Sequence, residues 1–188
     1  GYAYAKQLID KGSIKEGMEV YSKVEKLSKS ANLSESVYNQ AVKLGEAGKI
    51  QESLNLLNQI KGNYAKAKTL YDSMNSFHKK VSLWLGTWKH RGTVNGEKTT
   101  YYITFSEVLY KGEPCIKIKD MNNKALGYDI EISSKNHITQ IEVGKYMIHF
   151  KLKNNHNQKL TYTLLEGKKM LRELKYEGVT YKTKYKKK

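Results

Sequence analysis

The sequence predicts a segregated α+β protein. An antiparallel helical repeat of about five helices occupies residues 1–83, and an antiparallel all-β meander of about eight strands occupies residues 84–188. Before Trp84 the apolar residues recur at the spacing of amphipathic helices, and after Trp84 they alternate with polar residues as in strands. The helical part also repeats itself at an offset of 36 residues. The change of period near Trp84 therefore predicts a boundary between two domains.

Each copy of the repeat is predicted to form a helix, a glycine turn and a second helix. Ala5 matches Ala41, and Gly12 matches Gly48, at the same offset. Both glycines follow the first helix of their copy, where a left-handed backbone is needed, so we expect a structural role for them. A further helix beginning near residue 63 is expected to cap the stack, since an uncovered repeat face is insoluble.

These residues resemble the tetratricopeptide repeat over residues 2–61. The resemblance lies in the small and large pair Ala41 and Leu44 and in residues 46–53, EAGKIQES, which are similar to the opening of the family's second helix. The first copy departs from the family at Gly17, where the family carries Ala, and the period exceeds the usual 34 residues. The resemblance implies protein–protein scaffolding.

The C-terminal part reads as a series of short strands. Apolar residues alternate clearly over residues 101–105, 146–152 and 160–164, and less strongly around Val179 and Tyr181. Pairs such as Asn-Gly and Glu-Gly mark the turns between them. No helix-length segment interrupts the series, so the pattern fits an up-and-down barrel or a sandwich.

The segment Gly86-Thr87-Trp88 precedes the first of these strands and is similar to the Gly-x-Trp that opens lipocalin barrels. The resemblance implies that Trp88 is buried at one end of the β domain, and that the domain encloses a cavity for a lipophilic ligand. A domain of about 105 residues is short for that family, and its Tyr, Ile and Phe side chains are able to fill a small barrel.

The chain carries a formal charge of +16, with a pI near 9.6. Residues 1–83 hold 13 Lys/Arg and 8 Asp/Glu, a net of +5, and residues 84–188 hold 21 and 10, a net of +11. Basic surfaces favour nucleic acid, anionic lipid or wall polymers, although strand lysines also protect sheet edges. The candidate anionic-partner patch consists of Lys182, Lys184, Lys186, Lys187 and Lys188.

No catalytic, cofactor-binding or metal site is assigned from the sequence. The five histidines show no metal-ligand spacing, and the lone Cys115 has no histidine near it in sequence. Asp129 and Glu131 share a strand face and form a possible carboxylate pair, but a solvated outer face explains them better. We therefore expect no enzyme and no cofactor.

The sequence thus predicts a non-enzymatic bacterial binding or scaffolding protein at the cell surface. A protein partner is favoured, an anionic membrane or wall polymer comes next, a small-molecule carrier is an alternative, and nucleic acid is the least favoured ligand. The chain opens in a predicted helix without Met, which favours an N-terminal segment that has been cut away. We accordingly expect an extracytoplasmic, membrane-anchored protein or a lipoprotein.

Overall fold

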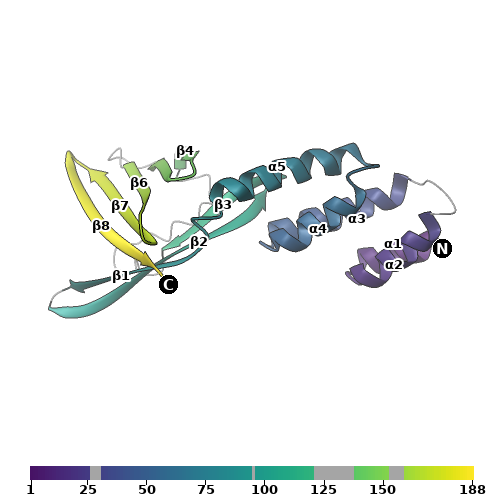
Figure 1. Ribbon diagram of the computed structural model, residues 1–188, viewed down its shortest axis with the longest axis horizontal. Helices are drawn as coiled ribbons and strands as arrows, with labels where there is room; N and C mark the ends of the chain where they lie inside the picture. The colour runs from purple at the N-terminus through teal and green to yellow at the C-terminus, as the bar shows by residue number, and fades with distance from the viewer. Residues whose placement is uncertain (26–30, 95, 121–137, 153–158) are drawn as a thin grey trace. The chain divides into compact units, whose positions relative to one another are not determined.

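A computed structural model describes residues 1–25, 31–94, 96–120, 138–152 and 159–188 (Figure 1). Within them, five helices precede eight strands that form one antiparallel, curled sheet. The predicted segregated α+β fold is therefore confirmed. The strand expected around Tyr128 and the carboxylate pair Asp129 and Glu131 lie outside the described residues.

The chain divides into two compact units. The helical unit comprises Gly1–Phe77 together with Val108–Cys115, and the β unit comprises His78–Glu107 together with Ile116–Lys188. The sequence predicts one boundary, after residue 83. The compact units instead divide after Phe77, and the hairpin segment Val108–Cys115 belongs to the helical unit. Each unit has its own core.

The helical unit contains two helix pairs and a fifth helix. Its helices are α1 (Tyr2–Asp10), α2 (Ile14–Glu25), α3 (Ala31–Glu46), α4 (Ile50–Ile60) and α5 (Ala65–Val81), the last of which continues into the β unit. Helix α1 packs on α2, α3 on α4, and α1 also packs on α3. The apolar faces meet in a core in which Ala5, Ala41 and Leu57 are fully buried.

The turns of the two copies are equivalent bond for bond. The Gly12 amide donates to the Ile9 carbonyl at 3.0 Å, and the Gly48 amide donates to the Gly45 carbonyl at 3.0 Å. Gly12 and Gly48 have φ angles of +89° and +78°, which an L side chain adopts only with strain. The 36-residue offset therefore corresponds to a repeated turn, with a left-handed glycine shortly after the first helix of each copy.

The two copies differ in how their paired helices approach each other. A Cβ on Gly17 would lie 2.6 Å from the Ile9 Cγ1 atom and 3.1 Å from the Ala5 carbonyl oxygen. At the matched position of the second copy, Ser53 is buried and donates to the Ala41 carbonyl at 2.6 Å. Glycine is therefore needed at position 17, because Ile9 fills the space that a side chain would occupy.

The second copy has the opposite arrangement, because Gly45 stands where the first copy has Ile9. The space beside Gly45 is filled by Leu109, which is 3% exposed and belongs to the core of the helical unit. Leu109 comes from the tip of a β hairpin, the segment Val108–Cys115. A strand residue thus fills a space in the core of the helical unit beside Gly45.

The sheet is a meander in which the first and last strands also pair. The strands are β1 (Gly86–Val94), β2 (Glu97–Tyr110), β3 (Glu113–Asp120), β4 (Ile138–Val143), β5 (Met147–Leu152), β6 (Lys159–Leu165), β7 (Lys169–Tyr176) and β8 (Val179–Lys187). Their order is β3-β2-β1-β8-β7-β6-β5-β4. Because β1 pairs with β8, the described strands form one continuous sheet with edges at β3 and β4. This sheet curls into a half-barrel (Figure 1).

Aromatic side chains fill the inner face of the sheet. Trp88 is 1% exposed and its Nε1 donates to the Trp84 carbonyl at 2.9 Å. Phe105 packs against Trp84 and Tyr162, with ring centroids 5.6 and 5.3 Å apart. Trp88 is the third residue of β1, so it lies at one end of that strand, and it is buried, as the sequence predicts.

Alternation predicts the inner face well at the centre of the strands and less well at their ends. Tyr146, Val179 and Tyr181 belong to apolar series in the sequence, yet they are 57%, 51% and 52% exposed. Leu171 faces outward, since it pairs with Lys184 on the opposite side of the sheet from Tyr185. The inner face is therefore packed only where neighbouring strands cover it.

Candidate functional site

Strand β8 divides its lysines between the two faces of the sheet. Successive side chains alternate, so Lys182, Lys184 and Lys186 share the outer face, whereas Tyr185, 5% exposed, belongs to the inner face. The structure thus brings three of the five predicted patch residues together on one face. Their spacing along the strand is about 7 Å from one lysine to the next.

Lys188 joins the same group just beyond the end of β8. Its amide donates to the Thr87 carbonyl at 2.8 Å, and its Nζ lies 5.9 Å from the centroid of the Tyr102 ring. Tyr102 pairs with Lys89 across the β1–β2 ladder, which places it on the outer face. Four of the predicted patch residues therefore lie on the same side.

Lys187 lies on the opposite face and does not belong to this patch. It pairs with Trp88, and its Nζ donates to the Leu83 carbonyl at 3.1 Å and lies 5.5 Å from the Trp88 ring centroid. Burial lowers the pKa of the Lys187 ammonium, and the nearby charge of Lys168 lowers it further. The alternation of β8 separates Lys187 from its neighbours, a signal already present in the sequence.

Basic side chains of three further strands extend the outer group. Lys186 lies opposite Lys169 of β7 and Lys89 of β1, and Lys175 of β7 lies opposite Lys159 of β6. We define the basic face as Lys89, Arg91, Lys159, Lys169, Lys175, Lys182, Lys184, Lys186 and Lys188. Lys89 is half-buried and the other eight are exposed.

One acidic side chain accompanies these nine cations on the outer face of β1, β6, β7 and β8 as the structure describes them. Glu173 forms an ion pair with Lys182 at 3.0 Å. Like charges directly opposite each other destabilise a sheet, so the lysine pairs give no stability to the fold. Protection of a sheet edge does not explain them either, because β8 is flanked by β1 and β7.

The charge is concentrated in the β unit as a whole. The helical unit holds 12 Lys/Arg and 9 Asp/Glu, a net of +3, whereas the β unit holds 22 and 9, a net of +13. The net positive charge of the β unit attracts anionic ligands over about one Debye length, roughly 10 Å at moderate salt. The basic face is therefore the stronger candidate binding surface.

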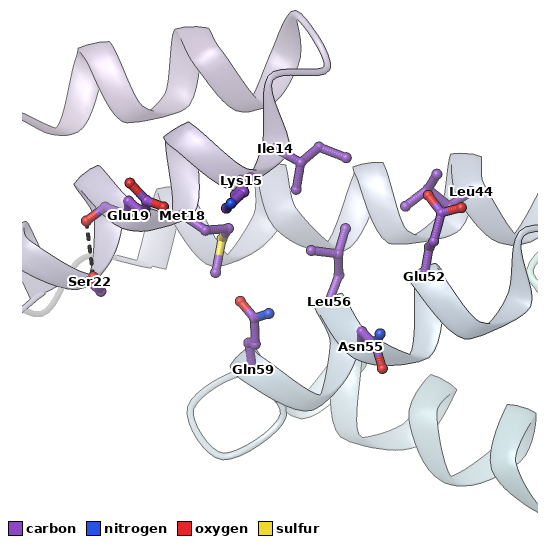
Figure 2. Close-up of a pocket in the computed structure, with 10 residues that line it drawn as sticks. All are labelled: Ile14, Lys15, Met18, Glu19, Ser22, Leu44, Glu52, Asn55, Leu56 and Gln59. Carbon is purple, nitrogen blue, oxygen red and sulfur yellow. Dashed lines mark hydrogen bonds between the residues drawn. The ribbon is translucent and has the colours of Figure 1, made fainter.

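The helical unit offers a second candidate, a groove of about 490 Å³ beside α2 and α4 (Figure 2). Its apolar lining comes from three helices: Ile14 and Met18 from α2, Leu44 from α3, and Leu56 from α4. The volume lies within the range of binding pockets, roughly 300–1,000 Å³. The groove follows the second helix of each repeat copy.

Polar side chains surround this apolar lining. Glu19 and Ser22 come from α2, and Glu52, Asn55 and Gln59 come from α4. With Lys15 included, the lining holds two carboxylates and one ammonium, in a chain that is otherwise strongly basic. The groove is therefore suited to an apolar ligand that carries a positive charge.

The β unit also contains a carboxylate–imidazole pair. Glu107 of β2 is 4% exposed, and its Oε2 lies 2.8 Å from the Nδ1 of His78. Burial raises the pKa of the Glu107 carboxyl above its usual range, while the hydrogen bond and charge of His78 act to lower it. Among the described residues, the pair is not part of a group of three or more His, Cys, Asp or Glu that could hold a metal ion.

The other chemical candidates are not brought together. His90 contacts the Lys184 carbonyl through Nδ1 at 2.9 Å and lies between the rings of Tyr101 and Tyr185. Cys115 is half-buried. The described residues contain no group of three or more His, Cys, Asp or Glu arranged to hold a metal ion. His137 and His156 lie outside the described residues.

Comparison with protein-family models, with curated proteins and with solved structures returned no match. In the part of the chain that the structure describes, no helix is both long and apolar enough to span a membrane.

Proposed function

We propose that this chain is a non-enzymatic binding protein that attaches to a phosphate-bearing or otherwise polyanionic surface through the basic face. The observation that carries the proposal is the pairing of lysines across central strands, with Glu173 as the one acid on the described outer face of those strands. An anionic ligand placed over these strands removes the repulsion between the lysines. Binding of the ligand therefore relieves the electrostatic repulsion that the paired lysines experience in the isolated protein.

A polyanion-binding assay tests this function. Dextran sulfate is a suitable probe, because it presents dense negative charge without a base or an acyl chain. Binding is expected to weaken steeply with salt, as for ligands that release counterions from several lysines. Lys184→Glu combined with Lys186→Glu should lower the affinity at least about tenfold, which corresponds to about 1.4 kcal/mol.

The matched control is Lys43→Glu combined with Lys66→Glu, which changes the net charge equally on two exposed residues of the helical unit. If the basic face is the binding site, the control variant should keep most of the affinity for dextran sulfate that the test variant loses. Equal losses in the two double variants would reduce the effect to total charge and reject the assignment. Unchanged binding in both would reject it as well.

The groove of the helical unit supports a second function, docking of a protein partner. Its apolar lining and its two carboxylates suit an amphipathic helix with apolar side chains on one face and a Lys or Arg beside them. A Leu/Lys helical peptide is the probe, and its Leu/Glu counterpart is the control. Met18→Glu should abolish binding of the Leu/Lys peptide, whereas Lys23→Glu, exposed and outside the groove lining, should not.

The carrier alternative receives less support. Trp88, Phe105 and Tyr162 occupy the inner face of the described strands, where a lipocalin-like ligand would lie. The extracytoplasmic location remains a prediction, and fractionation of the cells that produce the protein, with an antibody against the β unit, tests it.

A further inference from the structure

One end of the sheet gathers segments that are far apart in the sequence. Strands β1, β5 and β7 begin at this end, and β6 and β8 finish there. The Leu164 amide donates to the Tyr146 carbonyl at 2.8 Å, and the Lys187 amide donates to the Lys168 carbonyl at 3.0 Å. We call this region, formed by residues 82–89, 144–147, 165–169 and 185–188, the basic end of the β unit.

The basic end exposes large apolar side chains. Tyr146, Met147 and Leu165 are 57%, 52% and 39% exposed, and the register places Met147 opposite Thr163, two residues from Leu165. Leu83, 46% exposed, joins them, since its carbonyl accepts from Lys187 and the next residue, Trp84, donates to the Gly144 carbonyl at 3.1 Å. These four make up most of the large exposed hydrophobic residues in the described chain.

Positive charges surround these apolar side chains. The four segments contain seven lysines and one acid, Glu166, for a net charge of +6. The Nζ of Lys145 lies 5.2 Å from the centroid of the Tyr146 ring, and Lys169 and Lys186 are paired across β7 and β8. The basic end is continuous with the basic face through Lys89, Lys169 and Lys186.

Two chemical features together identify the partner. A soluble polyanion satisfies the lysines but leaves Leu83, Met147 and Leu165 in water. An anionic bilayer offers negative headgroups for the lysines and acyl chains beneath them for the apolar groups, and Tyr is favoured at that interface. Nucleic acid would favour stacked aromatic side chains, whereas three of these four residues are aliphatic or thioether.

From this combination, which rests on the polyanion-binding function proposed above, we infer that the basic end docks onto an anionic lipid bilayer. Leu83, Tyr146, Met147 and Leu165 enter the headgroup region, and the surrounding lysines contact lipid phosphates. The strands remain paired, and no part of the backbone needs to cross the bilayer.

Co-sedimentation of the full chain with vesicles tests the inference. The vesicles contain phosphatidylcholine alone or phosphatidylcholine mixed with phosphatidylglycerol. The protein should sediment with the mixed vesicles only, and salt should weaken binding. Met147→Ser combined with Leu165→Ser should weaken vesicle binding about tenfold or more while leaving dextran sulfate binding unchanged.

A matched control lies at the other end of β8. Val179→Ser combined with Tyr181→Ser removes two side chains of similar exposure, 51% and 52%, and should leave vesicle binding unchanged. Circular dichroism confirms that each variant remains folded. The Lys184→Glu and Lys186→Glu variant should weaken binding to both probes.

The outcomes separate the two proposals. Binding to dextran sulfate without binding to mixed vesicles would overturn the bilayer inference and leave the polyanion function standing. Binding to neither probe would overturn both. Equal binding to neutral and anionic vesicles, or vesicle binding that Met147→Ser with Leu165→Ser leaves intact, would also overturn the bilayer inference.

Discussion

The helical unit and the β unit differ in the charge of the residues that lie beside their lysines. On helices, Lys6 lies 2.6 Å from Asp10 and Lys68 lies 2.7 Å from Asp72, each pair four residues apart. On the sheet, Lys186 instead lies opposite Lys169 and Lys89. The first pattern contributes modestly to helix stability and the second opposes sheet stability. This difference is the reason for the proposal that the surface charge of the β unit serves a ligand rather than the fold.

The cores of the two units differ as well. Small residues such as Ala5, Ala41 and Gly17 allow the helices to approach closely, whereas Trp84 and Trp88 fill the inner face of the sheet. Close helix contacts are sensitive to added atoms, and an aromatic core is sensitive to their removal. This contrast can be tested with one substitution in each unit.

The largest effect is expected for Trp88→Ala. The substitution removes a fully buried indole and its hydrogen bond to the Trp84 carbonyl, so it should lower the free energy of unfolding by ~3–5 kcal/mol. Urea denaturation followed by circular dichroism measures the change. Tyr181→Ala, at a half-exposed position of the same unit, should stay within ~0.5 kcal/mol of the wild type. Similar losses in the two variants would contradict the assignment of Trp88 to the core.

A smaller loss is expected when a methyl group is added to the helical unit. Gly45→Ala should destabilise by ~1–3 kcal/mol, because the new Cβ meets the side chain of Leu109. In a Leu109→Ala background the same change should be neutral or stabilise by up to ~1 kcal/mol, since alanine favours helix more than glycine does. Thermal denaturation of the four variants measures this coupling. Additive effects would show that the hairpin residue does not pack against Gly45.

An increase in stability is expected for Lys186→Thr. The change removes the repulsion from Lys89 and Lys169, so it should raise the free energy of unfolding by ~0.2–1 kcal/mol while weakening polyanion binding. Chemical denaturation at low salt and a dextran sulfate titration measure the two quantities. A variant that loses stability would mean that these lysines serve the fold after all, as those of the helical unit do.

The smallest effect is confined to a pH window and concerns Glu107. Burial raises the pKa of its carboxyl in the folded state, so the folded protein retains a proton that the unfolded chain has already released. The contribution of Glu107 to the free energy of unfolding is fully present below the ordinary pKa of glutamate. It is lost as the pH rises through the raised pKa of the folded state. The difference in unfolding free energy between wild type and Glu107→Gln should decline over that window. A difference that is independent of pH would argue against the burial of this carboxyl.

Several features of this protein follow from local sequence. Helical spacing and two glycine turns predict the repeated helix pairs, because a left-handed turn glycine such as Gly12 or Gly48 depends on only a few neighbouring residues. Alternation likewise predicts the strands, and it assigns Lys182, Lys184 and Lys186 to one face. The same rule places Lys187 on the face of Trp88, so alternation alone separates it from the other four lysines of the predicted patch.

Other features depend on which segments meet, and only the tertiary structure decides that. Leu109 lies in a sequence pattern typical of a strand, but it completes the helical core because Gly45 leaves a space of the right size. The pairing of β1 with β8 joins residues about 100 positions apart and sets Lys89 opposite Lys186. Local periods fix the direction of each side chain, whereas long-range pairing fixes its neighbours. The basic face and the basic end of the β unit therefore became visible only in the folded chain.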